Sequence, residues 1–292
     1  MNILTYPCQI DSPTAVALGR FDGVHLAHKQ VISSAAKSDP TLAPTVFTFS
    51  DNPNKNCPYT LTTEEEKQAL ISACGTEILV NATFDSVRDM SAEEFFDKVI
   101  CSSLNAKALF CGFNYRFGKG AAADVNTLKK LCDERGISLT CIPEMQGTSS
   151  TEIRRLLGEG NVKSAAEKLG RPYTLKGSII HGKALGRTID TPTLNVDVPS
   201  QKQLPRFGVY ATTALIDGKT YKSVTNIGLK PTVGTDSPTV ETYLLDASGD
   251  FYSKEAKITL VDFIRPEERF SSLDELKSAI SKDINTAREI LA

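Results

Sequence analysis

Two of the three histidines in the chain lie close together, in the stretch "GRFDGVHLAHKQVI" (residues 19–32). His25 and His28 are three residues apart, which places them on one face if a helix begins there. Gly19 and Gly23 precede them and would let a bound ligand approach the backbone closely. A helix start also presents unpaired N–H groups and a favourable dipole to an anion. The segment predicts a phosphate site, although two surface histidines or a metal-binding pair would give the same spacing.

A second segment offers hydroxyl groups and a cation at another expected helix start. In "TSSTEIRRLL" (148–157), Ser149, Ser150 and Thr151 come just before a helical pattern, and Arg154 follows one turn later. Hydroxyls at a helix N-terminus together with a guanidinium can bind a triphosphate. Serine and threonine are also common helix caps, so this segment taken alone favours a cap.

The second half of the chain contains a glycine-rich segment, "GSIIHGKALGRTIDTPTLNVDV". Gly182 and Gly186 allow a loop to fold over phosphates. Thr193 and Asn195 are two residues apart, so both face one way if they lie on a strand. Their side-chain oxygens suit Mg²⁺, which also takes oxygens from substrate phosphates. Without further context, the polar edge of a strand is the simpler interpretation.

The first half must position the histidine segment, and it alternates short apolar runs with helical patterns. Such alternation predicts a parallel sheet covered on both faces, with ligands bound beyond the carboxyl ends of the strands. The histidine segment leaves a strand at that edge. Thr63 with Glu66, and Ser91 with Glu94, have the spacing of capping boxes. The expected strands cover residues 14–19, 44–49, 77–84, 106–112 and 137–143, and the expected helices cover 28–38, 62–74 and 91–104.

The second half is dominated by strand patterns from about residue 167 onward. The dipeptide Asp217-Gly218 is a strong signal for a two-residue hairpin, and a second turn is expected at residues 248–250. These signals predict a small antiparallel β-barrel. A terminal helix should follow, because Ser272 and Glu275 have capping-box spacing and precede an apolar repeat at helical spacing.

Length and composition exclude several classes of protein. The 292 residues suffice for two domains, which we place at 1–165 and 166–292. A net charge of −2 argues against a broad surface for nucleic acid. No apolar stretch is long enough to span a membrane, and the N-terminus lacks the pattern of a signal peptide. Seven cysteines without a CxxC pair favour reduced thiols, so we expect a cytoplasmic protein with no nucleic-acid or membrane partner.

"FDGVHLAH" and "SSTEIR", in this order, resemble the adenylyl-transferring half of bacterial bifunctional riboflavin kinase/FAD synthetases. "CGFNYRFGKG" (111–120) resembles the flavin-side segment of the same half. The sequence departs from the family at Ala27, where glycine is usual, at Asn52, where histidine is usual, and at residues 121–124, where "AAAD" replaces RxGD. The resemblance implies catalytic roles for His25 and His28, ATP binding by Gly19, Phe21, Gly23, Ser150, Thr151 and Arg154, and flavin binding by Asn114.

The residues after 170 resemble the riboflavin kinase module of that family. Its pattern is roughly GxVxxGxxxGRxxGxPTxN, and the residues that fit it are Gly177, Gly182, Gly186, Arg187, Pro192, Thr193 and Asn195. Asp190 and Thr191 stand where glycine and phenylalanine are usual, and "NIGLKPTVG" and "VETYLLD" resemble the next two family segments. The resemblance implies that Glu241 is the catalytic base and that Arg265 contacts the flavin. It further implies that Gly182, Gly186, Arg187, Thr193 and Asn195 bind ATP, the last two also holding Mg²⁺.

The resemblance implies a Rossmann-like nucleotidyltransferase domain followed by a kinase barrel. The kinase would phosphorylate riboflavin to FMN, and the first domain would adenylylate FMN to FAD with release of pyrophosphate. ATP with Mg²⁺ would serve both steps. Two alternatives stay open: a riboflavin kinase with an inactive first domain, which "HLAH" and "AAAD" would explain, and a flavin- or nucleotide-binding protein without catalysis. The oligomeric state is not predicted.

Overall fold

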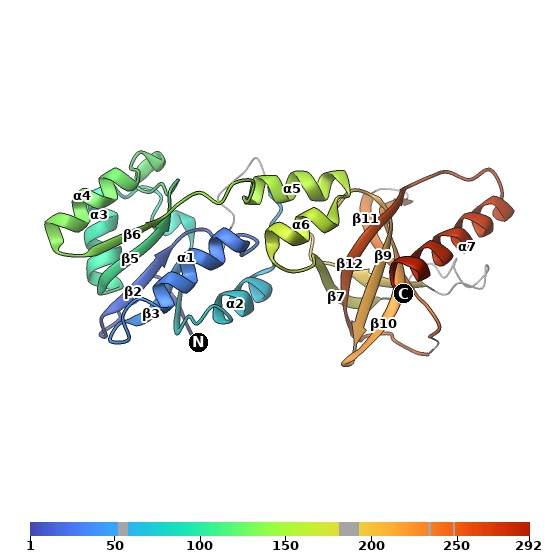
Figure 1. Ribbon diagram of the computed structural model, residues 1–292, viewed down its shortest axis with the longest axis horizontal. Helices are drawn as coiled ribbons and strands as arrows, with labels where there is room; N and C mark the ends of the chain where they lie inside the picture. Colours follow the sequence, from blue (N-terminus) through green and yellow to red (C-terminus); the bar gives the residue numbers. More distant parts are fainter. Residues whose placement is uncertain (52–57, 181–192, 233–234, 248) are drawn as a thin grey trace. The chain divides into compact units, whose positions relative to one another are not determined.

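The computed structural model describes residues 1–51, 58–180, 193–232, 235–247 and 249–292. The chain divides into two compact units, Met1–Ser150 and Thr151–Ala292 (Figure 1). The first contains a parallel sheet with helices and the second a closed antiparallel barrel with a terminal helix, which confirms the predicted fold class. The predicted boundary of the functional domains, after residue 165, stays a prediction.

The first unit is built on a six-stranded parallel sheet with the strand order β1-β4-β3-β2-β5-β6. Its five longer strands match the apolar runs in the sequence, whereas β1 was not predicted because only four mostly exposed residues form it. The strands are β1 (Asn2–Thr5), β2 (Thr14–Leu18), β3 (Ala43–Phe49), β4 (Ile78–Ala82), β5 (Ala106–Gly112) and β6 (Ser138–Ile142).

The helices of this unit begin at the expected caps. Thr63 and Ser91 both form complete capping boxes. The helix expected over 91–104 changes period after α3, because its last two turns are π-helical over Phe96–Ser103. The helices are α1 (Leu26–Ala36), α2 (Glu64–Ser72), α3 (Ala92–Phe95) and α4 (Val125–Arg135), with short 3₁₀ turns at Phe84–Ser86 and Lys119–Ala121.

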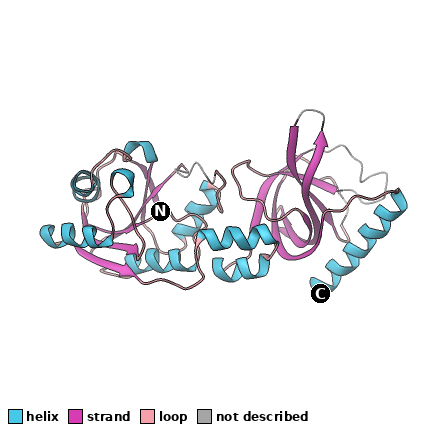
Figure 2. Cartoon of the chain, turned by 90° about the horizontal axis from the view of Figure 1, so that it is seen from above, coloured by secondary structure: helices cyan, strands magenta, loops and turns pink. Residues whose placement is uncertain are grey.

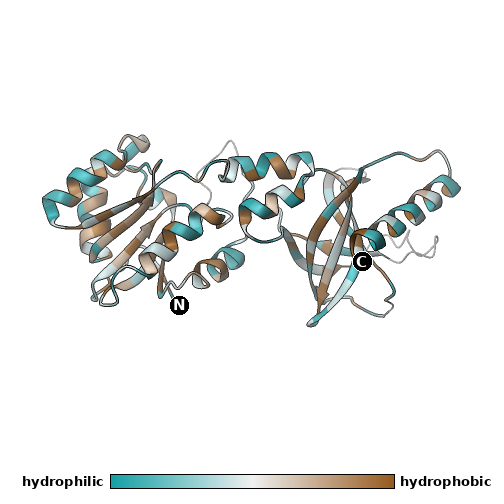
Figure 3. Cartoon of the chain, in the orientation of Figure 1, coloured by the Kyte–Doolittle hydropathy of each residue, from teal (hydrophilic) through white to brown (hydrophobic). Residues whose placement is uncertain are grey.

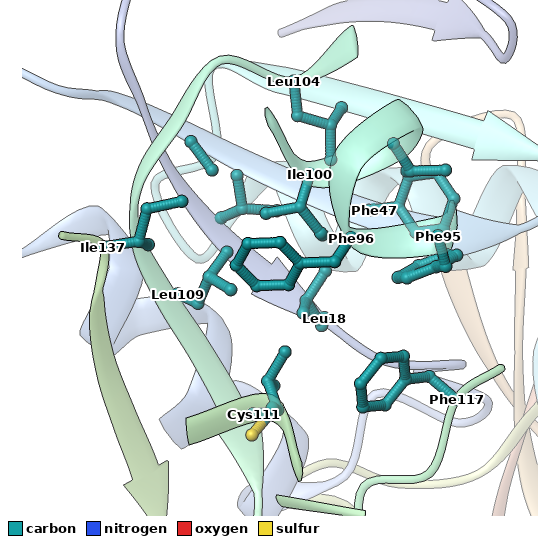
Figure 4. Packing of buried hydrophobic residues seen from close by; sticks show 14 of the residues in the cluster. Leu18, Phe47, Phe95, Phe96, Ile100, Leu104, Leu109, Cys111, Phe117 and Ile137 are labelled. Atoms are coloured by element: carbon teal, nitrogen blue, oxygen red, sulfur yellow. The ribbon is translucent and has the colours of Figure 1, made fainter. Parts of the chain in front are cut away.

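Strand β2 is buried on both faces, as expected of a central strand in a parallel sheet. Val16 and Leu18 belong to one core cluster, and Ala15 and Ala17 belong to another on the opposite face. Figure 4 shows the first cluster, in which Phe96 and neighbouring side chains of the π-helical segment lie over the strands. Figure 3 shows the same strands as largely apolar and the helices as two-sided. This packing fixes the end of β2, from which the histidine segment leaves.

The second unit is a closed barrel with the strand order β10-β11-β8-β7-β12-β9 (Figure 2). The predicted hairpin is confirmed: Asp217 and Gly218 have φ angles of 49° and 76° and join β9 to β10. The strands are β7 (Thr174–Ile180), β8 (Thr193–Asp197), β9 (Gly208–Ile216), β10 (Lys219–Thr232), β11 (Thr235–Leu244) and β12 (Glu255–Pro266). Ser248, part of the second expected turn, lies outside the described residues.

Four hydroxyl side chains form a chain of hydrogen bonds inside the barrel. Thr212 Oγ1 lies 2.8 Å from both Ser223 Oγ and Thr225 Oγ1, and Thr225 Oγ1 lies 3.0 Å from Thr242 Oγ1. All four residues are fully buried. The interior faces of β9, β10 and β11 are therefore identified, and the residues between these positions face outward.

Three helices accompany the barrel: α5 (Ser150–Glu159), α6 (Val162–Leu169) and α7 (Leu273–Ile290). Helix α6 was not predicted, although Asn161 caps its start and Gly170 ends it in the left-handed region. Helix α7 was predicted and packs on an outward apolar patch that includes Val209 and Val224. Its expected capping box is only half formed, because the Glu275 carboxylate accepts the N–H of Ser271 rather than that of Ser272.

Candidate active sites

The loop between β2 and α1 is held in an unusual backbone conformation. Phe21, Gly23 and Val24 all have positive φ angles, of 51°, 84° and 38°. Phe21 and Val24 are nonetheless buried. A Cβ atom at Gly19 would lie 2.8 Å from the Phe21 ring, so only glycine leaves room for that ring. Strained, buried residues in a loop at the carboxyl edge of a sheet are typical of a functional site.

His25 is the N-cap of α1, and its Nδ1 accepts the backbone N–H of His28 at 3.3 Å. Because Nδ1 is the acceptor, the neutral imidazole must carry its proton on Nε2. The helix start predicted from the sequence is therefore confirmed, and the capping bond selects one tautomer of His25. Ala27 lies half-buried in the first turn, so the fold accommodates its methyl group.

The His25 and His28 rings are stacked, with centroids 3.5 Å apart and planes 19° from parallel. The edge-to-face contact of Phe21 with His28, at 5.4 Å between centroids, supports the stack. Burial, and then the neighbouring His25, lower the pKa of His28 well below its ordinary value near 6.5. His28 is therefore uncharged at neutral pH, and it would meet a phosphate through an N–H group rather than through a positive charge.

Acidification is expected to destabilise the first unit through His28. Its pKa is lower in the folded state than in the unfolded state, so stability is retained above pH 6.5 and falls as the pH drops below that value. The unfolded chain then binds a proton that the folded chain does not, which costs up to about 1.4 kcal/mol per pH unit.

Thermal unfolding at about pH 7 and about pH 5 measures this effect, with His28→Gln as the comparison because glutamine does not titrate. The melting temperature of the wild type should fall further between the two pH values than that of the variant. An equal loss in both proteins would contradict the assignment.

Ser150, the last residue of the first unit, contacts the histidine loop of the same unit. Ser150 Oγ donates a hydrogen bond to the backbone carbonyl of Asp22 at 2.9 Å, across 128 residues of sequence. The Asp22 carboxylate in turn accepts the N–H of Leu61 at 2.8 Å. Thr151 is exposed in the first turn of α5, and Arg154 is half-buried at the start of the second turn. Ser150 therefore contacts the histidine loop directly, a role that sequence spacing did not reveal.

Asn114 lies exposed in the loop that follows β5. Strand β5 pairs in parallel with β2, so this loop and the histidine loop leave the same edge of the sheet. The flavin-side segment is thereby placed at the edge where ligands bind in such sheets.

The barrel places Glu241 and Asn195 opposite each other on neighbouring strands. Glu241 of β11 pairs with Asn195 of β8, and Tyr243 pairs with Thr193. These four residues alternate with Thr242 and Leu194, so they share the outward face. Thr193 and Asn195 are thus on one face, as predicted. Gly182, Gly186 and Arg187 lie outside the described residues.

Thr193 and Asn195 fit a magnesium site that substrate would complete. Both supply neutral oxygen donors, and Mg²⁺ at a nucleotide site typically takes only one or two protein ligands. Across the described part of the chain, no group of three or more His, Cys, Asp or Glu residues could hold a metal ion unaided. A metal at this site would depend on the phosphates of a bound nucleotide.

Arg265, expected near the flavin, forms a two-pronged ion pair with Asp283 of α7. Its Nε and Nη2 lie 2.9 and 2.8 Å from the two carboxylate oxygens, and Asp283 is 4% exposed. The guanidinium also lies over the Phe270 ring. These contacts attach α7 to the barrel, whereas the flavin contact stays a prediction.

Replacing Arg265 by alanine should leave the buried Asp283 carboxylate without this partner. We expect the free energy of unfolding of the barrel to fall by about 3 kcal/mol. Urea unfolding followed by circular dichroism measures it, with Arg269→Ala as the control because Arg269 is exposed. Unchanged stability combined with a raised KM for riboflavin would assign Arg265 to the flavin instead.

Comparisons with known proteins agree with both halves of this description. A FAD synthetase family model matches residues 8–154, and a riboflavin kinase family model matches residues 169–291. Bifunctional riboflavin kinase/FMN adenylyltransferases from Listeria monocytogenes and Escherichia coli are 33% and 34% identical to the chain, covering 97% and 94% of it and 94% and 91% of their own lengths. The Bacillus subtilis relative is 34% identical, with 92% and 90% covered.

A crystal structure described as a macrolide-efflux protein from Streptococcus pneumoniae matches with a TM-score of 0.89 and 28% identity, over 99% of each chain. In the described part of the present chain, no helix is both long and apolar enough to cross a membrane.

The fold and the two family models define a transferase with one flavin kinase domain and one FAD synthetase domain. The chain belongs to the bifunctional riboflavin kinase/FMN adenylyltransferase family.

Proposed function

We propose that the chain makes FAD from riboflavin in two ATP-dependent steps at two separate sites. The barrel, around Glu241, would form FMN, and the β2–α1 loop, around His25 and His28, would form FAD. Family membership supports both activities. The observation that supports two separate sites is the position of each motif. Glu241 lies on the outward face of a barrel strand, and the histidine loop lies at the carboxyl edge of a parallel sheet.

In the kinase step, the Glu241 carboxylate would accept the proton of the ribityl 5′-hydroxyl. The hydroxyl oxygen would then attack the γ-phosphorus of ATP, forming FMN and releasing ADP. Thr193 and Asn195, on the neighbouring strand, would hold ATP with Mg²⁺ beside the carboxylate. When bound, the metal would neutralise charge on the transferring phosphoryl group.

In the adenylylation step, the FMN phosphate would attack the α-phosphorus of ATP and release pyrophosphate. His25 would donate a hydrogen bond from Nε2 to the negative charge that develops on the reacting phosphate, because its Nδ1 is occupied by the capping bond. The N-terminal N–H groups of α1 favour the same negative charge. Thr151 and Arg154 are proposed to hold the triphosphate, Ser150 to fix the loop, and Asn114 to contact the flavin. Such chemistry proceeds mainly by positioning and by charge stabilisation.

A single assay distinguishes this proposal from its alternatives. The purified chain is incubated with riboflavin, ATP and Mg²⁺, and the flavins are separated by chromatography. Formation of FAD supports both steps, whereas accumulation of FMN alone supports a kinase with an inactive first domain. Unchanged riboflavin, and no FAD from supplied FMN, would indicate a binding protein without catalysis. A cytoplasmic location stays a prediction from the sequence.

A further inference from the structure

A row of polar residues crosses three neighbouring strands of the barrel at Glu241. Glu241 of β11 is in register with Asn195 of β8 on one side and with Asn226 of β10 on the other. On β10, Thr225 points into the barrel, so Asn226 faces outward with Glu241. Directly paired residues have Cβ atoms about 4.5–5.5 Å apart. The carboxamide of Asn226 therefore lies close enough to the Glu241 carboxylate for one small polar group of a ligand to contact both.

Asn226 lies at the boundary between covered and open surface. Its partner on the next strand, Val209, is 5% exposed and belongs to the apolar patch under α7. Asn226 itself is only half-buried. Among the residues that the structure describes, its carboxamide has no hydrogen-bond partner. The group is thus available to a ligand on the side of Glu241 away from Asn195.

A second carboxylate lies two residues further along the same face. A Cβ atom at Gly228 would fall 1.7 Å from Oε1 of Glu267, so this carboxylate occupies the space that a side chain would fill. Gly228 faces outward like Asn226, because the two are separated by the buried Ile227. An amide and a carboxylate suit hydroxyl groups, which both donate and accept, better than they suit phosphates.

We propose that Asn226 binds the ribityl 4′-hydroxyl of riboflavin, next to the hydroxyl that is phosphorylated. The inference rests on the proposed kinase function, in which Glu241 accepts the 5′ proton and Asn195 lies on the nucleotide side. The ribityl chain then lies on the β10 side of Glu241, next to Asn226. The 5′ oxygen lies at Glu241, between Asn226 on the polyol side and Asn195 on the nucleotide side. Adjacent carbons of the polyol carry hydroxyls at a spacing that the neighbouring side chains of a β-sheet can follow. Asn226 is accordingly a specificity-determining residue of the kinase site.

The decisive experiment compares riboflavin with 4′-deoxyriboflavin in the wild type and in Asn226→Ala. Loss of a hydrogen bond in a site built to bind a hydroxyl should cost about tenfold in kcat/KM. We expect this penalty when the wild type is given the deoxy substrate and when the variant is given riboflavin. Combining variant and deoxy substrate should add no further penalty. The KM for ATP should be unchanged, and Asn226→Ser should recover part of the loss.

Thr213→Ala is the matched control, because Thr213 is an outward-facing polar residue on the neighbouring strand β9, paired with Lys222. Circular dichroism and thermal unfolding report that the barrel of each variant is folded, and FAD synthesis from supplied FMN reports that the other unit is unaffected. An equal penalty for the deoxy substrate in wild type and Asn226→Ala would overturn the inference, as would an unchanged KM for riboflavin in the variant. A wild type that forms no FMN would overturn the proposed kinase function instead.

Discussion

We expect the substitution Glu241→Gln to remove nearly all FMN formation, while FAD synthesis from supplied FMN should continue at the wild-type rate. Glutamine keeps the size of the side chain but cannot accept the hydroxyl proton. General-base catalysis typically contributes about 10²–10⁴-fold, so kcat should fall by at least about a hundredfold. The neighbouring Asn195 would still hold the nucleotide, and the KM for ATP should change little. Chromatography of the flavins in two separate assays measures both activities.

Glu255→Gln is a suitable control, because Glu255 is an exposed acid on β12 of the same barrel. It should leave both activities unchanged. Equal loss of both steps in Glu241→Gln would contradict two separate sites, and retention of FMN formation would remove Glu241 as the base.

The second large effect is expected for His25→Ala, which should reduce FAD formation about 10²–10³-fold and spare FMN formation. The substitution removes a proposed donor to the developing negative charge, and single donors of this kind are worth that much. It also removes the N-cap of α1, which should lower stability by about 1 kcal/mol. Initial rates with FMN and ATP, together with thermal unfolding, separate the two consequences.

His25→Asn distinguishes catalysis from capping. Asparagine is among the best N-cap residues, so α1 should keep its stability, yet the side chain is too short to replace the imidazole Nε2–H. Loss of FAD formation in both variants, with destabilisation only in His25→Ala, is the expected pattern. Full activity of His25→Asn would reduce the role of His25 to that of a helix cap.

Elements with strong local signals were predictable from the sequence. The alternation of apolar runs and helical patterns gave the parallel sheet, and Asp217-Gly218 gave the hairpin. Thr63 and Ser91 gave complete caps because a capping box depends on residues only three apart. Strand β1 carries no such signal, since its pairing with β4 depends on residues more than seventy positions away.

The contacts that assemble the sites were less accessible to sequence reasoning. The position of the histidine loop could be predicted from the end of β2, but the Ser150–Asp22 hydrogen bond is purely tertiary. Family resemblance predicts a flavin contact for Arg265, whereas its pairing with Asp283 depends on how α7 folds back onto the barrel. The role of Asn226 is not evident from the sequence, because a single asparagine in a strand is unremarkable until the register places it beside Glu241.

The division of the chain at residue 150 bears on how the two activities could ever become separate proteins. Ser150 closes the first compact unit, whereas Thr151 and Arg154 of the same motif belong to the second. A gene split at that boundary would leave Ser150 with the first unit and would place Thr151 and Arg154, which we propose to hold the triphosphate, with the barrel. On the proposed roles of Thr151 and Arg154, an adenylyltransferase separated from the kinase would need to keep α5.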